Sequence, residues 1–107
     1  MKALLLATLA GGFFLFPAQA AIAAEHEVQI SAYKFEPAEL TIKRGDTVVW
    51  VNREKRVSHS VLFSGSGEES ERFFPDEKWS RVFDEPGRYE YGCGPHPEMM
   101  GVVIVTD

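Results

Sequence analysis

Polar and apolar residues alternate along several short segments of the chain, and this period of two is typical of half-buried β-strands. Residues 27–32 alternate in this way, and residues 40–43 do the same before an Arg-Gly-Asp turn. Residues 47–51 are rich in β-branched side chains and include Trp50, a composition that also favours a strand. Four further segments complete the expected set of strands: 58–63, 78–83, 88–92 and 102–106.

About seven short strands separated by Gly, Pro and Asp turn signals predict an all-β fold, a Greek-key antiparallel β-sandwich. The β-branched runs and the frequent Gly and Pro residues argue against a helical alternative. Alternation places His59 on the same face of its expected strand as two apolar residues. It also places Cys93 on the face shared by Tyr89 and Tyr91.

The longest connection between expected strands runs over residues 64–77. It begins with a Ser-Gly-Ser-Gly run, and its acidic cluster predicts a solvated loop. The same carboxylates would attract basic partners over a distance. The acidic residues are Glu68, Glu69, Glu71, Asp76 and Glu77.

The start of the chain differs from the rest, because residues 3–16 are apolar and carry no charge. This run of 14 residues is shorter than the about 20 that a transmembrane helix needs. Pro17 and a small-x-small pattern ending at Ala20 follow it, so we predict a cleavable secretory signal peptide at 1–20 and a single exported domain at 21–107. The alternatives are an uncleaved membrane anchor and cleavage after Ala23 or Ala24. Export predicts a periplasmic location, where thiols tend to oxidise.

Composition narrows the possible functions. The 107 residues include 16 acidic and 11 basic side chains, which gives a formal net charge of −5. This acidic balance argues against a nucleic-acid binder, which needs Lys and Arg to neutralise phosphates. The single cysteine, Cys93, cannot form an internal disulfide. In an exported protein, an unpaired cysteine indicates intermolecular pairing or metal ligation.

Three potential metal ligands lie within seven residues between the last two expected strands: Cys93, His96 and Met99. His59, near the middle of the chain, supplies a second imidazole. Two histidines and one cysteine with a weak axial methionine form the ligand pattern of a blue-copper electron-transfer site. Thiolate and thioether favour Cu(I) whereas imidazole serves both oxidation states, so such a site binds both. The prolines on either side of His96 restrict its backbone, as a fixed ligand loop requires.

Each of these residues also has an ordinary explanation. Taken singly, Cys93 could be a small buried side chain, His59 a core histidine, and Met99 or Met100 a filler of the core. His26, between two glutamates, is expected to be solvated. Zinc is the main alternative metal, but a structural zinc site takes four strong ligands and this domain offers three. The joint placement of the four side chains favours copper.

Longer segments around these residues resemble the cupredoxins, the small blue-copper proteins, and within them the amicyanin type. The matching segments are 35–42, 48–54 followed by the first histidine, and 85–93. The spacing C-x2-H-x2-M is similar to the short ligand loop of that type. The resemblance implies an eight-stranded Greek-key β-sandwich with one type 1 copper ion. It implies four ligands: His59, Cys93, His96 and Met99.

The sequence departs from the family pattern at positions close to these ligands. Ser60 stands where an Asn usually ties the first histidine's loop to the cysteine loop, and Gly94 stands where a Ser or Thr hydroxyl is usual. The link between the two loops is therefore expected to be weaker or built differently. Met100 is a rival to Met99 as the axial ligand. Glu98 replaces a large apolar residue beside the exposed histidine.

We predict a periplasmic type 1 copper protein that carries single electrons between larger redox partners, cycling between Cu(I) and Cu(II). The expected partners are a c-type cytochrome or a periplasmic dehydrogenase, and the resemblance suggests one for methylamine. The electron would leave through the imidazole edge of His96, inside an apolar rim of Pro95, Pro97 and Met100. We expect a monomer. We do not expect an enzyme, because no second metal cluster, nucleophile triad or paired carboxylates stand out. The alternative is a periplasmic copper carrier or buffer without a dedicated redox role, which would use the same soft ligands.

Overall fold

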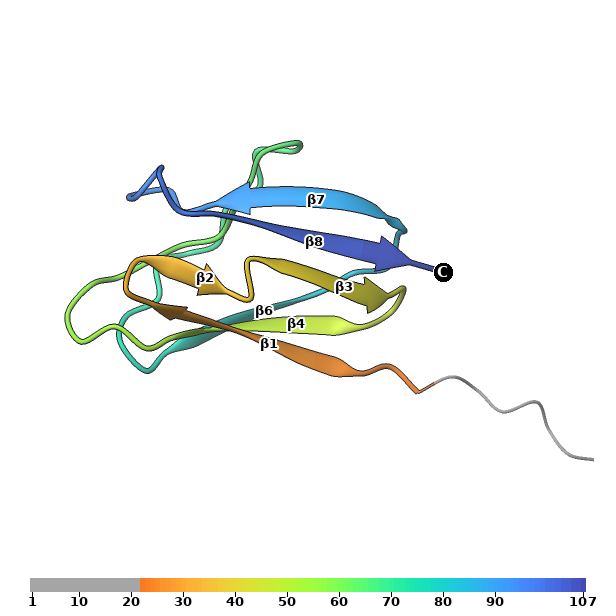
Figure 1. Cartoon of the computed structure of the whole chain (residues 1–107), viewed down its shortest axis with the longest axis horizontal. Helices are drawn as coiled ribbons and strands as arrows, with labels where there is room; N and C mark the ends of the chain where they lie inside the picture. The colour runs from red at the N-terminus through yellow and green to blue at the C-terminus, as the bar shows by residue number, and fades with distance from the viewer. Residues whose placement is uncertain (1–21) are drawn as a thin grey trace, which may run out of the picture.

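The structure is a computed structural model, and it describes residues 22–107. This part of the chain contains eight β-strands joined by turns and loops (Figure 1). The predicted signal peptide at 1–20 lies outside the described residues. Within residues 22–107 no helix is long and apolar enough to cross a membrane. The strands are β1 (Glu25–Ser31), β2 (Lys34–Glu36), β3 (Glu39–Lys43), β4 (Thr47–Asn52), β5 (Leu62–Phe63), β6 (Lys78–Val82), β7 (Gly87–Gly92) and β8 (Met100–Thr106).

The strands form two four-stranded sheets stacked as a sandwich, with the orders β2-β1-β4-β6 and β3-β8-β7-β5 (Figure 1). The predicted all-β sandwich is confirmed, and so is the number of strands that the family resemblance implies. Alternation of polar and apolar residues locates most strands to within a few residues. The expected segments 27–32, 40–43, 47–51, 78–83, 88–92 and 102–106 correspond to β1, β3, β4, β6, β7 and β8.

Both sheets are mixed, so the expectation of purely antiparallel pairing needs a correction. β1 pairs with β4 in parallel, and β3 pairs with β8 in parallel, whereas the other neighbouring strands are antiparallel. Parallel neighbours require a long crossover connection. Here the chain passes through β2 and then β3, which belongs to the other sheet, before β4 returns to the side of β1.

One strand is shorter than the alternation predicts, and another is not predicted at all. The segment 58–63 forms a strand only at β5. His59, Ser60 and Val61 are all fully buried, so burial does not alternate there as it does in a strand with one solvent face. In β2 only Phe35 is buried, and three residues are too few to give a recognisable period.

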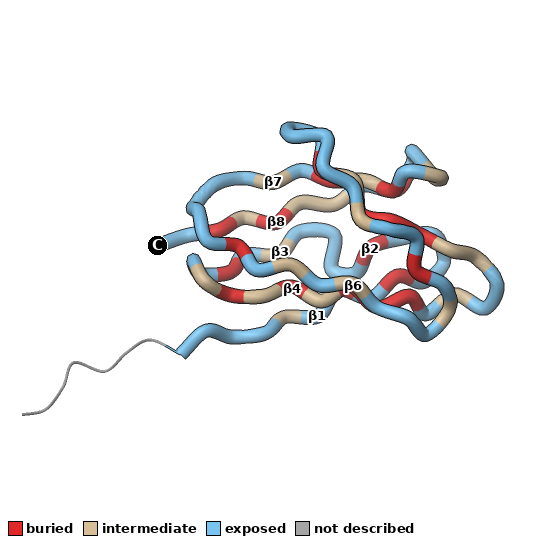
Figure 2. Tube along the Cα trace, turned by 180° about the vertical axis from the view of Figure 1, so that it is seen from behind, coloured by how far each residue is buried: buried red, intermediate tan, exposed pale blue. Residues whose placement is uncertain are grey.

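Trp50 lies at the centre of the core and is fully buried. Four aromatic rings surround it at centroid distances of 5.3–6.4 Å: Phe63, Trp79, Phe83 and Tyr91. Figure 2 shows buried positions recurring along the strands of both sheets. Cys93 and Met99 belong to the same buried cluster as Trp50. The core therefore extends without a break to two of the expected copper ligands.

Asp46 fastens the segment before β1 to the turn between β3 and β4. Figure 1 shows this turn at the end of the sandwich away from the loop between β7 and β8. The Asp46 carboxylate accepts hydrogen bonds from the Ala24 backbone N–H at 2.9 Å and the Lys43 backbone N–H at 3.1 Å. The third donor is Nε2 of His26 at 2.9 Å, so the expectation of a solvated His26 is wrong. The backbone and His26 hydrogen bonds lower the pKa of Asp46 from 3.8 to about 2.

This lowered pKa makes the stability of the metal-free protein depend on pH. Because the folded carboxyl holds its proton less tightly than the unfolded one, Asp46 stabilises the fold above its ordinary pKa of 3.8, and this contribution is lost as the pH falls to about 2. In the wild type, the thermal unfolding midpoint should fall as the pH is lowered from 3.8 to about 2. We expect this fall to be smaller in Asp46→Asn. Asp84→Asn, at an exposed position, serves as the control and should keep the wild-type slope. Equal slopes for wild type and Asp46→Asn would refute the assignment.

Candidate metal centre

His59 reaches the candidate site from the segment between β4 and β5 and is fully buried. Its Nδ1 lies 3.5 Å from Sγ of Cys93, and its Nε2 lies 3.3 Å from Oε2 of Glu54. A proton on Nε2 that is donated to Glu54 leaves Nδ1 free to bind a metal. Burial lowers the pKa of His59, while the hydrogen bond to Glu54 opposes this shift. The neutral imidazole that a metal ligand must be is therefore favoured.

Glu54 is itself held in place, which the sequence analysis does not predict. Its backbone N–H donates to Oδ1 of Asn52 at 2.8 Å, and its carboxylate accepts the backbone N–H of Tyr33 at 2.8 Å. Asn52 is fully buried, and its amide donates to the carbonyls of Val57 and Phe73. Glu54 thus connects the end of β4 to His59. The only local sequence signal for the role of Glu54 is that its carboxylate stands five residues before His59.

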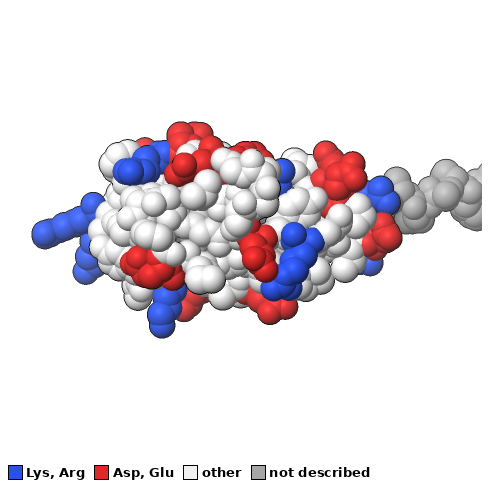
Figure 3. Space-filling model, turned by 90° about the horizontal axis from the view of Figure 1, so that it is seen from above, with Lys and Arg blue, Asp and Glu red and all other residues white. Residues whose placement is uncertain are grey.

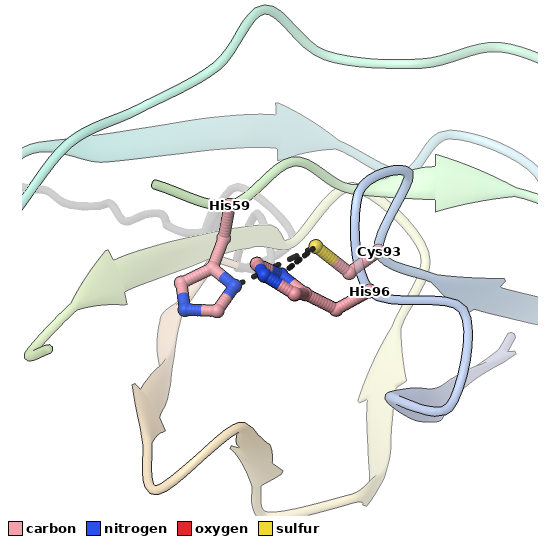
Figure 4. A group of neighbouring side chains, drawn as sticks. All are labelled: His59, Cys93 and His96. Carbon is pink, nitrogen blue, oxygen red and sulfur yellow. Dashed lines mark hydrogen bonds between the residues drawn. The ribbon is translucent and has the colours of Figure 1, made fainter. Parts of the chain in front are cut away.

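Cys93 and His96 lie on the loop between β7 and β8. Cys93 is 2% exposed, and its Sγ lies 3.6 Å from Nδ1 of His96 (Figure 4). The backbone N–H of Ser60 donates to the same sulfur at 3.4 Å. The loop turns tightly, because the N–H of His96 donates to the carbonyl of Cys93 and the N–H of Met99 donates to the carbonyl of His96. These turns direct both ligand atoms to one point.

The three ligand atoms fit a single metal ion. They lie within 4.8 Å of one another, and within the described residues no other histidine, cysteine or carboxylate group meets the same criterion. An ion at about 2.0–2.1 Å from nitrogen and about 2.3 Å from sulfur gives nitrogen–sulfur separations of about 3.5–3.8 Å for tetrahedral to trigonal angles. The two observed separations are 3.5 and 3.6 Å. A thiolate and two imidazoles in this arrangement suit copper.

The two neighbouring methionines differ sharply in exposure. Met99 is 2% exposed and packs in the buried cluster that contains Cys93, whereas Met100 is 71% exposed. Both methionines line the surface cavity of about 670 Å³ that Cys93 also borders, so only their exposure separates them. An axial ligand has to point into the protein, and burial therefore supports Met99 over Met100.

The surface above His96 includes an aromatic ring that the sequence analysis missed. Tyr33 meets the ring of His96 edge-on at a centroid distance of 4.9 Å and the ring of His59 at 5.9 Å. Tyr33 is 42% exposed and lines a surface hollow together with Met100, a member of the expected rim. Its backbone has a φ of 58°, a left-handed conformation that no sequence pattern announces.

The acidic connection 64–77 is mostly exposed, as predicted, but four of its carboxylates have specific partners, and one of these is Asp76, which pairs with Arg53 at 3.9 Å. Glu68 pairs with Arg81 at 3.2 Å, Glu77 accepts the Phe74 N–H at 2.8 Å, and Glu69 accepts a hydrogen bond from Ser60. Acidic and basic groups alternate around an uncharged area on the face shown in Figure 3. The surface charge in that view is mixed and does not form one acidic field.

Comparison with known proteins agrees with this geometry. Residues 22–106 match the model of the copper binding proteins of the plastocyanin/azurin family. Amicyanin-alpha of Methylorubrum extorquens is 41% identical over 104 residues, which cover 92% of this chain and 86% of the relative. Amicyanin of Paracoccus denitrificans is 41% identical over 83 residues, which cover 73% of this chain but only 63% of that relative's length.

Solved amicyanin structures show the same fold. An oxidized amicyanin variant superposes with a TM-score of 0.71 at 38% identity, covering 75% of this chain and 80% of the other. A reduced Cu(I) form of another variant gives a TM-score of 0.71 at 38% identity, covering 82% of this chain and 86% of the other.

The fold and the donor set define a cupredoxin. The chain belongs to the plastocyanin/azurin family of copper-binding proteins, and its cofactor is copper. The resemblance to blue-copper proteins is thereby confirmed.

Proposed function

We propose that this protein is a periplasmic electron carrier with one type 1 copper ion held by His59, Cys93, His96 and Met99. The observation that carries the proposal is the convergence of two imidazole nitrogens on one buried thiol sulfur, at 3.5 and 3.6 Å. Bound copper supplies a one-electron couple between Cu(I) and Cu(II). The solved oxidized and reduced amicyanin forms support such a couple.

The side chains around the ligands favour electron transfer because they leave little to rearrange. The ring of His59 is oriented by Glu54, and the thiolate of Cys93 accepts the N–H of Ser60. Both ligands are almost fully buried, so water is excluded from them. When ligands are held by hydrogen bonds and packing, a change of oxidation state requires little movement of the protein.

His96 is the proposed route for the electron, since it is the histidine ligand that is only partly buried. The exposed ring of Tyr33 packs against it, and Tyr33 lines a surface hollow with exposed Met100, so the two provide an apolar contact area for a partner. We propose a c-type cytochrome or a periplasmic dehydrogenase as that partner, a monomeric state, and the role of a carrier and not of an enzyme. The predicted export signal at 1–20 supports the periplasmic location.

The alternative, a copper carrier or buffer, differs in what happens on reduction. We expect the copper-loaded protein to oxidise a reduced c-type cytochrome, to lose its blue colour and to regain it with an oxidant while copper stays bound. Stopped-flow absorbance and metal analysis after gel filtration measure both properties, with metal-free protein as the control. Release of copper on reduction would contradict the electron-carrier proposal and favour the buffer.

A further inference from the structure

Glu69 lies in the acidic connection between β5 and β6, yet its backbone is fixed. It forms an isolated bridge with Leu62, and the next residue, Ser70, exchanges hydrogen bonds with Val61. The backbone N–H of Ser70 donates to the Val61 carbonyl at 2.9 Å, and the N–H of Val61 donates to Oγ of Ser70 at 2.9 Å. The position of Glu69 is therefore set by two strand-like contacts.

Ser60 connects this carboxylate to the cysteine loop. It is fully buried, and its hydroxyl donates to Oε2 of Glu69 at 2.8 Å. The same hydroxyl accepts the backbone N–H of Gly94 at 3.0 Å, and the backbone N–H of Ser60 donates to Sγ of Cys93. One serine thus joins the Glu69 carboxylate to the sulfur and to the peptide that follows it.

Gly94 completes the arrangement because it has no side chain. A Cβ at this position would collide with Oε2 of Glu69 and would lie 3.0 Å from Oγ of Ser60. The Glu69 carboxylate occupies the space that a side chain at residue 94 would take. The two departures from the family pattern, at 60 and 94, are thereby linked, since the serine hydroxyl donates to the carboxylate and the carboxylate lies where a side chain at residue 94 would be.

We propose that Glu69 is a positioning residue of the copper site, which through Ser60 holds the Cys93–Gly94 segment and places a negative charge beside Gly94, the residue that follows the thiolate. This inference rests on the proposed copper function. The hydrogen bonds restrain the sulfur ligand, so they slow the loss of copper. The negative charge stabilises Cu(II) relative to Cu(I), because Cu(II) carries the larger positive charge.

Three variants separate the hydrogen bond from the charge. We expect Glu69→Gln, which keeps an acceptor for Ser60, to raise the reduction potential while the copper release rate stays near that of wild type. Because solvent screens a partly exposed carboxylate, the rise in reduction potential should not exceed about 59 mV. That rise corresponds to an about tenfold change in the ratio of the Cu(II) and Cu(I) affinities. Glu69→Ala should also release copper about tenfold faster. Glu71→Ala removes the same charge from the same connection and should change neither property.

A double-mutant cycle in the metal-free protein tests the contact itself, through a property that does not involve copper. Gly94→Ala should lower the thermal unfolding midpoint, and the loss should be much smaller in the Glu69→Ala background, where the collision with the carboxylate is gone. Additive effects of the two substitutions would overturn the proposed contact. If Gly94→Ala does not fold alone, recovery of folding in the double variant supports the contact, and continued failure contradicts it.

These outcomes are distinct from a failure of the proposed function. A wild-type protein that gives no blue copper complex would refute the electron-carrier proposal whatever Glu69 does. A blue wild type whose Glu69→Gln and Glu69→Ala variants match Glu71→Ala in potential and copper release would refute the role of Glu69 alone.

Discussion

Replacing Cys93 by serine should abolish the intense blue absorption of the copper-loaded protein completely. That absorption arises from charge transfer between a thiolate and Cu(II), and Cys93 is the only cysteine in the chain. Serine keeps the size of the side chain but is a harder and far weaker donor to copper. We expect copper titration followed by visible spectroscopy to show no blue band and much weaker binding.

The control for this substitution is the fold of the metal-free variant. Cys93 makes its hydrogen bond as an acceptor from the Ser60 N–H, and a serine oxygen can accept the same proton. The circular dichroism spectrum should therefore remain that of a β-sandwich. A folded Cys93→Ser variant that still turns blue with copper would show that the sulfur ligand is assigned wrongly.

Glu54→Ala should lower the affinity for copper by about 10–100-fold, the usual effect of removing the partner that orients a metal-binding histidine. The carboxylate accepts the Nε2 proton of His59 and also holds the backbone of Tyr33, whose ring packs against both histidines. Without it, His59 loses the partner that selects its tautomer. Competition with a copper chelator measures the change.

Two further variants make this result specific. Glu54→Gln retains an acceptor oxygen and should lie between wild type and Glu54→Ala. Glu98→Ala removes an exposed carboxylate from the loop that carries His96, so it controls for the loss of charge near the site. Equal copper affinities for Glu54→Ala and Glu98→Ala would mean that Glu54 does not position His59.

The candidate ligands could be found from the sequence because their chemistry is rare and mostly local. Cys93, His96 and Met99 fall within seven residues, so two tight turns are enough to bring them together. His59 is 34 residues from Cys93, and its inclusion depended on ligand chemistry and on the family resemblance. Most strands could also be predicted from local sequence, because a strand with one buried face alternates apolar and polar residues.

The surroundings of the ligands were less predictable because they depend on segments that meet only in the folded protein. Nothing near Glu69 indicates that its carboxylate takes the place of a side chain at Gly94. Tyr33 reaches the histidines from a left-handed turn, and His26 finds Asp46 across 20 residues. The parallel pairs were missed for the same reason, because alternation shows that a strand exists but does not show its neighbour.

The most direct test is to titrate the metal-free domain, residues 21–107, with Cu(II) while recording its visible spectrum. A site with one thiolate and two imidazoles around one ion predicts an intense blue band that grows linearly and saturates at one copper per chain. A pale complex with no thiolate band, or copper binding that leaves Cys93 free to react with a thiol reagent, would contradict the assigned centre.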